Sequence, residues 1–123
     1  MERVTLNGTP ATPSVVLDSE QGKLEFSGRS LPEDTLTFYR PILNWIDDYL
    51  HINKGNTHTD ISIKLEYFNT ATSKVILNML SRFENTGNVN VHWFHYQEDE
   101  DMLESGKEFQ ELVKLPFHFH TFE

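Results

Sequence analysis

The side chains best suited to chemistry in this sequence are the hydroxyls that follow Asn69. The run 69–73 separates an alternating apolar segment from a helical pattern. It therefore falls where a strand ends and a helix begins, and the free N–H groups and dipole of a helix start favour an anion. The simpler interpretation is that Asn69 or Thr70 caps the helix and contributes about 1 kcal/mol, and position alone favours that role. Alternatively Thr70 accepts a phosphate, and Thr72 and Ser73 are the other candidate acceptors.

A phosphate on Thr70 would alter the helix start strongly. It would add a charge of about −1.5 to −2 and three acceptor oxygens. Lys74 lies one turn further along the predicted helix and could pair with it. The phosphate would also change the charge and shape of any docking face that this loop forms.

The histidines predict no metal site. His92 and His95 are three residues apart in a predicted strand, so their side chains point to opposite faces. His118 and His120 share a face, but two ligands without a third are too few for a typical site. The sequence has no HExxH pattern. We therefore expect histidines that pack or form hydrogen bonds, with no metal and no cofactor.

Other catalytic signatures are missing from the sequence. It contains no GxSxG elbow, no GxGxxG loop and no Walker-type loop. The acidic run 98–101 is explained by negative charge at a helix start. We predict no catalytic residue. One alternative is a small enzyme that depends on a metal or on histidine and carboxylates, with His92 or His95 next to an acidic residue in a pocket. Another is an unregulated structural or oligomerisation domain, which would carry no modification.

Length and composition limit the class of protein. The chain of 123 residues predicts one domain over residues 1–123. Its net charge of −9 argues against binding to nucleic acid or to an anionic membrane surface, and it suits a basic patch on a protein partner. The chain has no cysteine, no apolar run near the ~20 residues of a membrane span and no signal-peptide pattern. We expect a cytoplasmic protein.

Apolar periodicity predicts the elements that position these residues. Residues 1–14 form an extended entry segment, 15–27 a hairpin and 28–32 a loop. The first helix has its regular part from about Phe38, and a strand over 60–68 follows. A helix over 75–83, a strand over 89–96, a helix after the acidic run and a strand over 117–122 complete the chain. The apolar stripe predicted for the first helix consists of Leu36, Tyr39, Leu43, Ile46 and Leu50.

The predicted order β-β-α-β-α-β-α-β defines an α/β fold. Strands separated by helices imply right-handed crossovers onto one mixed sheet with about three flanking helices. On the strand over 60–68, the alternation places Ile61, Ile63, Leu65 and Tyr67 on one face.

Short segments along nearly the whole chain carry a family likeness. They are residues 8–13 (GTPATP), 22–34 (GKLEFSGRSLPED), 38–46 (FYRPILNWI), 67–70 (YFNT), 91–93 (VHW) with Tyr96 nearby, 102–109 (MLESGKEF) and 116–117 (PF). Together, and in this order, they resemble the SiaC-type regulatory phosphoproteins, a family long known only as a domain of unknown function.

The resemblance implies a fold and a function. The fold would be similar to the STAS-like domain of anti-sigma factor antagonists. The threonine after the strand-end asparagine, here Thr70, would be phosphorylated by a protein kinase and dephosphorylated by a PP2C-type phosphatase. The unphosphorylated form would bind an output protein such as a diguanylate cyclase. Family members commonly have serine after this threonine, whereas this chain has Ala71, which could alter recognition by the kinase.

Our hypothesis is therefore a non-enzymatic signalling switch that exchanges partners. The expected docking face is the helix over 75–83 together with the strand-to-helix turn. The turn residues assigned to partner binding are Tyr67, Asn69, Thr70, Ala71, Thr72, Ser73 and Lys74.

Overall fold

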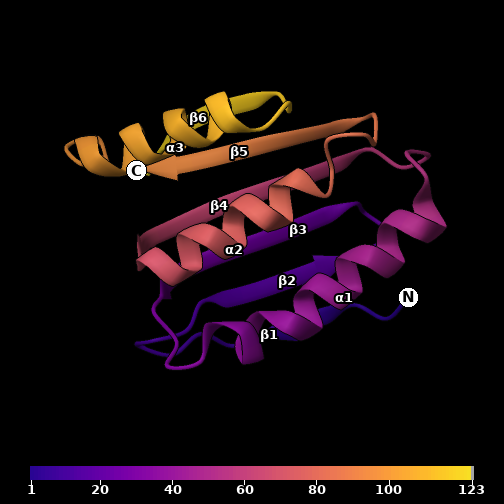
Figure 1. The fold of residues 1–123 in the computed structure, drawn as a ribbon, viewed down its shortest axis with the longest axis horizontal. Helices are drawn as coiled ribbons and strands as arrows, with labels where there is room; N and C mark the ends of the chain where they lie inside the picture. The colour runs from indigo at the N-terminus through magenta and orange to yellow at the C-terminus, as the bar shows by residue number, and fades with distance from the viewer. Residues whose placement is uncertain (123) are drawn as a thin grey trace.

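Six strands form one mixed sheet, and three helices connect its parallel strands (Figure 1). The structure, a computed structural model, describes residues 1–122. In chain order the elements are β1 (Val4–Leu6), β2 (Ser14–Asp18), β3 (Lys23–Ser30), α1 (Thr35–Asn53), β4 (Thr59–Phe68), α2 (Thr70–Ser81), β5 (Val89–His95), α3 (Glu100–Leu112) and β6 (Phe117–Thr121).

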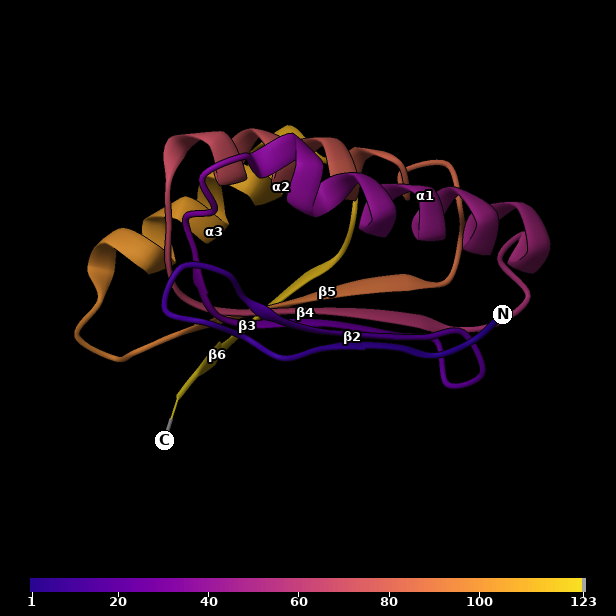
Figure 2. The ribbon, with the colours of Figure 1, turned by 90° about the horizontal axis from the view of Figure 1, so that it is seen from below.

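The strands lie side by side in the order of the chain. β1, β2 and β3 are antiparallel neighbours joined by loops, whereas β3 to β6 run parallel, so each connection between them needs a crossover. Because these crossovers advance across the sheet in one direction, right-handed connections place all three helices on the same face. Figure 2 shows the helices on one side of the sheet and the opposite side without a helix.

The core lies between the sheet and the helices. Its centre consists of alternate residues on β4 and β5, and Ile61, Val91 and Trp93 have no exposed surface. The indole N–H of Trp93 donates to the carbonyl of Met102 at 2.9 Å. Met102 lies on α3, and so does Gly106, where an added Cβ would lie 2.5 Å from Cδ1 of Trp93. Helix α3 therefore approaches the sheet closely because a glycine faces the indole.

Helix α1 begins earlier than the predicted start near Phe38. Asp34 is its N-cap and its carboxylate accepts from the N–H of Thr37 at 3.1 Å, so the helix starts at Thr35. Pro41 then falls inside the helix. The capping carboxylate fixes the first turn, and the exposed proline removes one hydrogen bond of the ladder without ending the helix.

The apolar stripe predicted for α1 is partly wrong. Tyr39 and Ile46 are buried as expected, but Leu36 is 61% exposed, and Leu43 and Leu50 are only partly buried. The side that faces the core is completed instead by Ile42, Trp45 and Tyr49. Two leucines of the predicted stripe are consequently left at the surface between α1 and α2.

The N-terminal part contains more strand than the sequence predicts. Residues 1–14 include β1, which pairs with β2. β3 continues to Ser30, where we expected a loop over residues 28–32, through a shift of register between Gly28 and Arg29. Gly28 has φ of 93°, a conformation that glycine adopts easily. The longer strand brings Ser30 next to the end of β4.

Within residues 1–122, no helix is both long and apolar enough to cross a membrane.

Candidate functional site

The run 69–73 forms the predicted turn from β4 into α2. Asn69 is the N-cap, and its Oδ1 accepts from the N–H of Thr72 at 2.9 Å. The N–H of Asn69 donates to the carbonyl of Ser30 at 3.1 Å, which ties the turn to β3. Thr70 is the first residue of the helix and is exposed. Asn69 therefore caps the helix while Thr70 is exposed, and the capping hydrogen bond does not use the hydroxyl of Thr70.

A buried network of hydroxyl groups lies beneath this turn. Thr72 and Ser30 have no exposed surface. The hydroxyl of Thr72 donates to the carbonyl of Ser30 at 3.1 Å, and its oxygen lies 2.9 Å from Oγ of Ser30. Oγ of Ser30 also lies 2.7 Å from the Tyr39 hydroxyl. Burial raises the pKa of Tyr39 to about 12. Thr72 is thus sealed beneath the helix start, which disfavours it as an alternative phosphate acceptor.

An apolar groove between α1 and α2 begins at Thr70. Its volume is about 570 Å³. Leu36 and Leu43 line it from α1, and Ala71 and Val75 line it from α2, together with Thr35, Thr70, Lys74 and Asn78. The surface leucines of α1 therefore form one wall of a groove whose opposite wall carries the candidate phosphoacceptor.

A smaller hollow lies on the other side of α2. It measures about 130 Å³, and Phe68, Leu77 and Phe109 contribute its apolar walls. Ser73 and Lys74 also line it, so Lys74 borders the hollows on both sides of the helix. The first turn of α2 consequently stands as a ridge between two depressions, a shape that suits a protein partner.

Tyr67 lies outside the core, contrary to its predicted place on the apolar face of β4. It is 44% exposed, and the guanidinium of Arg29 lies 5.2 Å from the centre of its ring. Strand β4 has one extra residue, Glu66, opposite β3, so Arg29 pairs with Tyr67. Phe68 packs instead against the buried Trp93, with ring centres 6.1 Å apart. The exposed tyrosine therefore extends the surface around the turn.

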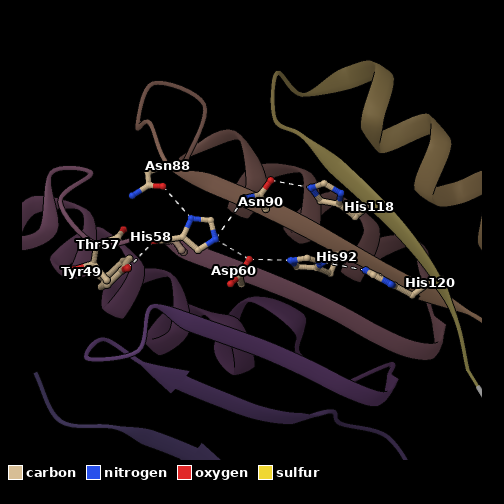
Figure 3. Close-up of polar contacts among 10 residues, drawn as sticks. Tyr49, Thr57, His58, Asp60, Asn88, Asn90, His92, His118 and His120 are labelled. Atoms are coloured by element: carbon tan, nitrogen blue, oxygen red, sulfur yellow. Dashed lines mark hydrogen bonds and ion pairs between the residues drawn. The ribbon is translucent and has the colours of Figure 1, made fainter.

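Histidines gather on the sheet face that no helix covers (Figure 3). Oδ1 of Asp60 lies 2.9 Å from Nε2 of His92 and 3.1 Å from Nε2 of His58. His92 Nδ1 lies 3.0 Å from Nε2 of His120. Nε2 of His118 lies 2.9 Å from Oδ1 of Asn90. Strands β4, β5 and β6 are thus linked by one carboxylate and several imidazoles.

The pKa values of this cluster respond to its contacts. Burial raises the pKa of the Asp60 carboxyl, but hydrogen bonds from His92 and His58, together with the charges of these two rings, hold that pKa below its ordinary value. Hydrogen bonds to Asn88 and Asp60 raise the pKa of His58. Burial, followed by the neighbouring histidines, lowers the pKa of His120.

His92 and His95 point to opposite sides of β5, as predicted. His95 is buried, and its Nδ1–H donates to the carbonyl of Tyr96 at 2.9 Å. His92 does meet a carboxylate, Asp60, and both border a shallow hollow of about 290 Å³. Among residues 1–122, no three His, Asp or Glu side chains already converge as a metal-binding set.

Comparison with known proteins identifies the family. The model of the SiaC family of regulatory phosphoproteins matches residues 6–122. The chain belongs to the SiaC family. This confirms the family resemblance. An uncharacterised protein of Pseudomonas aeruginosa (strain UCBPP-PA14) is 26% identical over 121 residues, which are 95% of this chain and 94% of that protein.

Solved structures of SiaC agree with the fold. A chain in the crystal structure of the diguanylate cyclase SiaD in complex with its activator SiaC, from Pseudomonas aeruginosa, matches with a TM-score of 0.88 and 25% identity over 97% of this chain and 99% of that chain. Apo-SiaC from the same organism matches with a TM-score of 0.83 and 27% identity over 98% and 99% of the two chains. The predicted α/β class, with one mixed sheet and three helices, is confirmed for this SiaC-family chain.

Several residues near these sites escaped the sequence reasoning. Ser30 contacts the start of α2 in this SiaC-family protein, and Tyr39 contacts Ser30 in turn. Asp60 links β4 to His92 on β5 and to His58. A partial signal existed, because Asp60 and His92 both fall on the polar side of alternating strands. Their contact depends on which residues pair across the sheet, which periodicity does not specify.

Proposed function

We propose that this SiaC-family chain is a partner-switching signalling protein, without catalysis of its own, that is controlled by reversible phosphorylation of Thr70. A protein kinase adds the phosphate and a PP2C-type phosphatase removes it. The output partner is a protein such as a diguanylate cyclase, because a matching chain occurs in a complex of the cyclase SiaD with its activator SiaC. The single observation that carries the proposal is the exposed Thr70 at the start of α2, beside an apolar groove.

The local geometry suits Thr70 better than its two neighbours. Thr70 is exposed, Ser73 is partly buried beside α3, and Thr72 has no exposed surface. A kinase must bring the acceptor hydroxyl within bonding distance of a phosphoryl group, so the exposed residue requires the least opening of the helix. A phosphate on Thr70 would also sit at the positive end of the dipole of α2.

The switch works through charge placed next to an apolar surface. The unphosphorylated groove offers Leu36, Leu43 and Val75 to apolar side chains of the output partner. A phosphate on Thr70 adds about −1.5 to −2 charges at the edge of that contact, and the partner would have to remove water from it. Lys74 borders the same groove and holds the phosphate over its entrance. Phosphorylation therefore disfavours the output partner.

The test uses the chain, its cognate kinase and ATP, with intact mass spectrometry and a binding assay against the cognate cyclase. The wild type gains one phosphoryl group and then loses affinity for the cyclase. Thr70→Ala gains none and binds the cyclase with or without ATP. Thr70→Glu binds it less well than Thr70→Ala, although one carboxylate imitates a phosphate only in part.

Ser73→Ala is the matched control, since it removes a hydroxyl from the same turn. It keeps both the phosphorylation and the loss of binding. Stoichiometric phosphorylation of Thr70→Ala would show that the acceptor is a different residue. A wild-type chain that binds the cyclase equally well in both states would refute the switch itself.

A further inference from the structure

The uncovered face of the sheet brings together three histidines that are distant in the sequence. His92 lies on β5, and His118 and His120 lie on the edge strand β6. The strand register pairs His92 with His118 and places His120 two pairs further along, opposite Phe94. The ring centre of His92 lies 5.2 Å from that of His118 and 5.2 Å from that of His120. Figure 3 shows the three rings on the same side of the sheet.

Two of these rings already present nitrogen atoms to each other. Nδ1 of His92 lies 3.0 Å from Nε2 of His120. A tetrahedral zinc ion with Zn–N bonds of 2.0–2.1 Å holds two ligand nitrogens roughly 3.3 Å apart. To accept an ion of this size, the pair must open by a few tenths of an ångström. Both rings must also tilt, because in the hydrogen bond the two nitrogens point at each other and not at a shared ion.

The second nitrogen of His92 has the partner that a metal ligand requires. Its Nε2 lies 2.9 Å from Oδ1 of Asp60, which His58 also contacts. A carboxylate that accepts a hydrogen bond from Nε2–H keeps the proton of His92 on Nε2, so Nδ1 has a lone pair that accepts from Nε2–H of His120. This carboxylate–histidine arrangement supports most histidine ligands of metals, because it fixes the tautomer and the ring orientation. For both nitrogens to bind one ion, the ring proton of His120 must move from Nε2 to Nδ1.

The third ring needs one rearrangement. Nε2 of His118 is now 2.9 Å from Oδ1 of Asn90, which is why no set of three already converges among residues 1–122. His118 is exposed on the edge strand, so its side chain can turn away from Asn90 towards its neighbours without displacing the core. Lys64, the nearby cation, is paired with Glu25 at 2.9 Å.

We propose that His92, His118 and His120 bind one first-row transition-metal ion, with zinc as the reference ion, on the uncovered face of the sheet. Three imidazoles and a water molecule are an established zinc donor set, and imidazole also suits copper and nickel. The ion links β6 to β5. It lies on the face opposite the helices, so the proposal does not depend on phosphorylation of Thr70.

Calorimetric titration of the untagged protein with zinc chloride tests the proposal. The wild type binds one zinc ion. His120→Asn and His118→Asn each weaken binding by more than about 100-fold, since loss of an outer-shell carboxylate alone costs about 10- to 100-fold. Asp60→Asn falls in that outer-shell range. His51→Asn, an exposed histidine on α1, binds zinc as the wild type does and is the matched control.

A second measurement avoids variants altogether. Nitrogen chemical shifts of the imidazole rings, recorded on the wild type during zinc addition, should move for His92, His118 and His120 and stay constant for His51 and His95. The proposal is overturned if the untagged protein shows no saturable zinc binding, or if affinity survives His120→Asn. Retained affinity in His118→Asn overturns the three-histidine site.

Discussion

The two faces of the sheet differ in what covers them and in the side chains they present. On the covered side, three helices bury the core, and their outer surface carries an apolar groove beside Thr70. The opposite side has no helix, and its half-buried positions carry Asp60, His92 and other polar groups linked by hydrogen bonds. One sheet therefore supports two chemically separate surfaces, and a perturbation of one should leave the other unchanged.

A charge in the groove should have the largest effect. Ala71→Asp places a carboxylate in the apolar groove, where a bound partner would leave it unpaired. We expect affinity for the cognate cyclase to fall by about 100-fold, or about 2.8 kcal/mol, in a surface binding assay. The variant should stay folded, because an acidic residue in the first turn of a helix is favourable.

Ser27→Asp is the matched control on the uncovered face. Ser27 lies on β3, paired in register with Lys64, and it is partly buried. The same change of charge there should leave cyclase binding within about twofold of the wild type, since surface substitutions away from a contact change free energies by less than about 0.5 kcal/mol. Equal losses in the two variants would show that the groove is not the docking surface.

On the covered face, ionisation of the buried Tyr39 should lower the free energy of unfolding at alkaline pH. Tyr39 has a pKa of about 12 in the folded chain, against 10.0 for the free side chain. Between these values the unfolded chain loses the proton first, so stability present below pH 10 is lost as pH rises towards 12. Two pKa units correspond to at most about 2.7 kcal/mol. Urea unfolding at pH 9 to 12 measures the loss.

Tyr39→Phe separates this effect from general alkaline unfolding. It should be less stable than the wild type at neutral pH, because Oγ of Ser30 loses one partner. Its stability should depend less on pH above 10. Part of the slope will remain, since burial also raises the pKa of Tyr49. An unchanged slope would show that Tyr39 does not titrate as its burial indicates.

A small gain is expected on the uncovered face. Asn90→Ala removes the contact that holds His118 away from His92 and His120. One hydrogen bond contributes about 0.5–1.5 kcal/mol, so zinc affinity should rise by roughly 2- to 10-fold in the calorimetric titration. Cyclase binding should be the same as in the wild type. A weaker zinc affinity would show that Asn90 supports the ion instead of competing with it.

Local sequence patterns specified much of the fold and the position of the turn. The alternation in β4 and β5 and the turn at Asn69 predicted a strand followed by a helix, and the structure agrees. The predictions failed where a distant contact decides the outcome. Leu36 belongs to the periodic stripe of α1, yet it is exposed, because the neighbouring helix α2 does not cover it. Tyr67 lies off the predicted face because β4 has an extra residue, Glu66, in its pairing with β3, and this residue shifts the alternation of side chains beyond Leu65.

The candidate phosphorylation site likewise has features that local sequence predicts and features that depend on distant contacts. Position in the sequence placed Asn69 and Thr70 at a helix start and favoured a capping role, and the family resemblance then singled out Thr70 as the phosphate acceptor. The structure shows that Asn69 is the cap and that Thr70 is exposed. The burial of Thr72 beneath Ser30 required the close approach of β3, α1 and α2.

The histidines also show what the sequence determined and what only strand pairing decided. Spacing along the chain correctly separated His92 from His95 and placed His118 with His120, because side chains alternate along a strand. Only the pairing of β5 with β6 brought His92 between them, 28 residues from His120 in the chain. A strand fixes which residues share a face by its own geometry. Which strands become neighbours, and in which register, follows from the packing of the whole molecule.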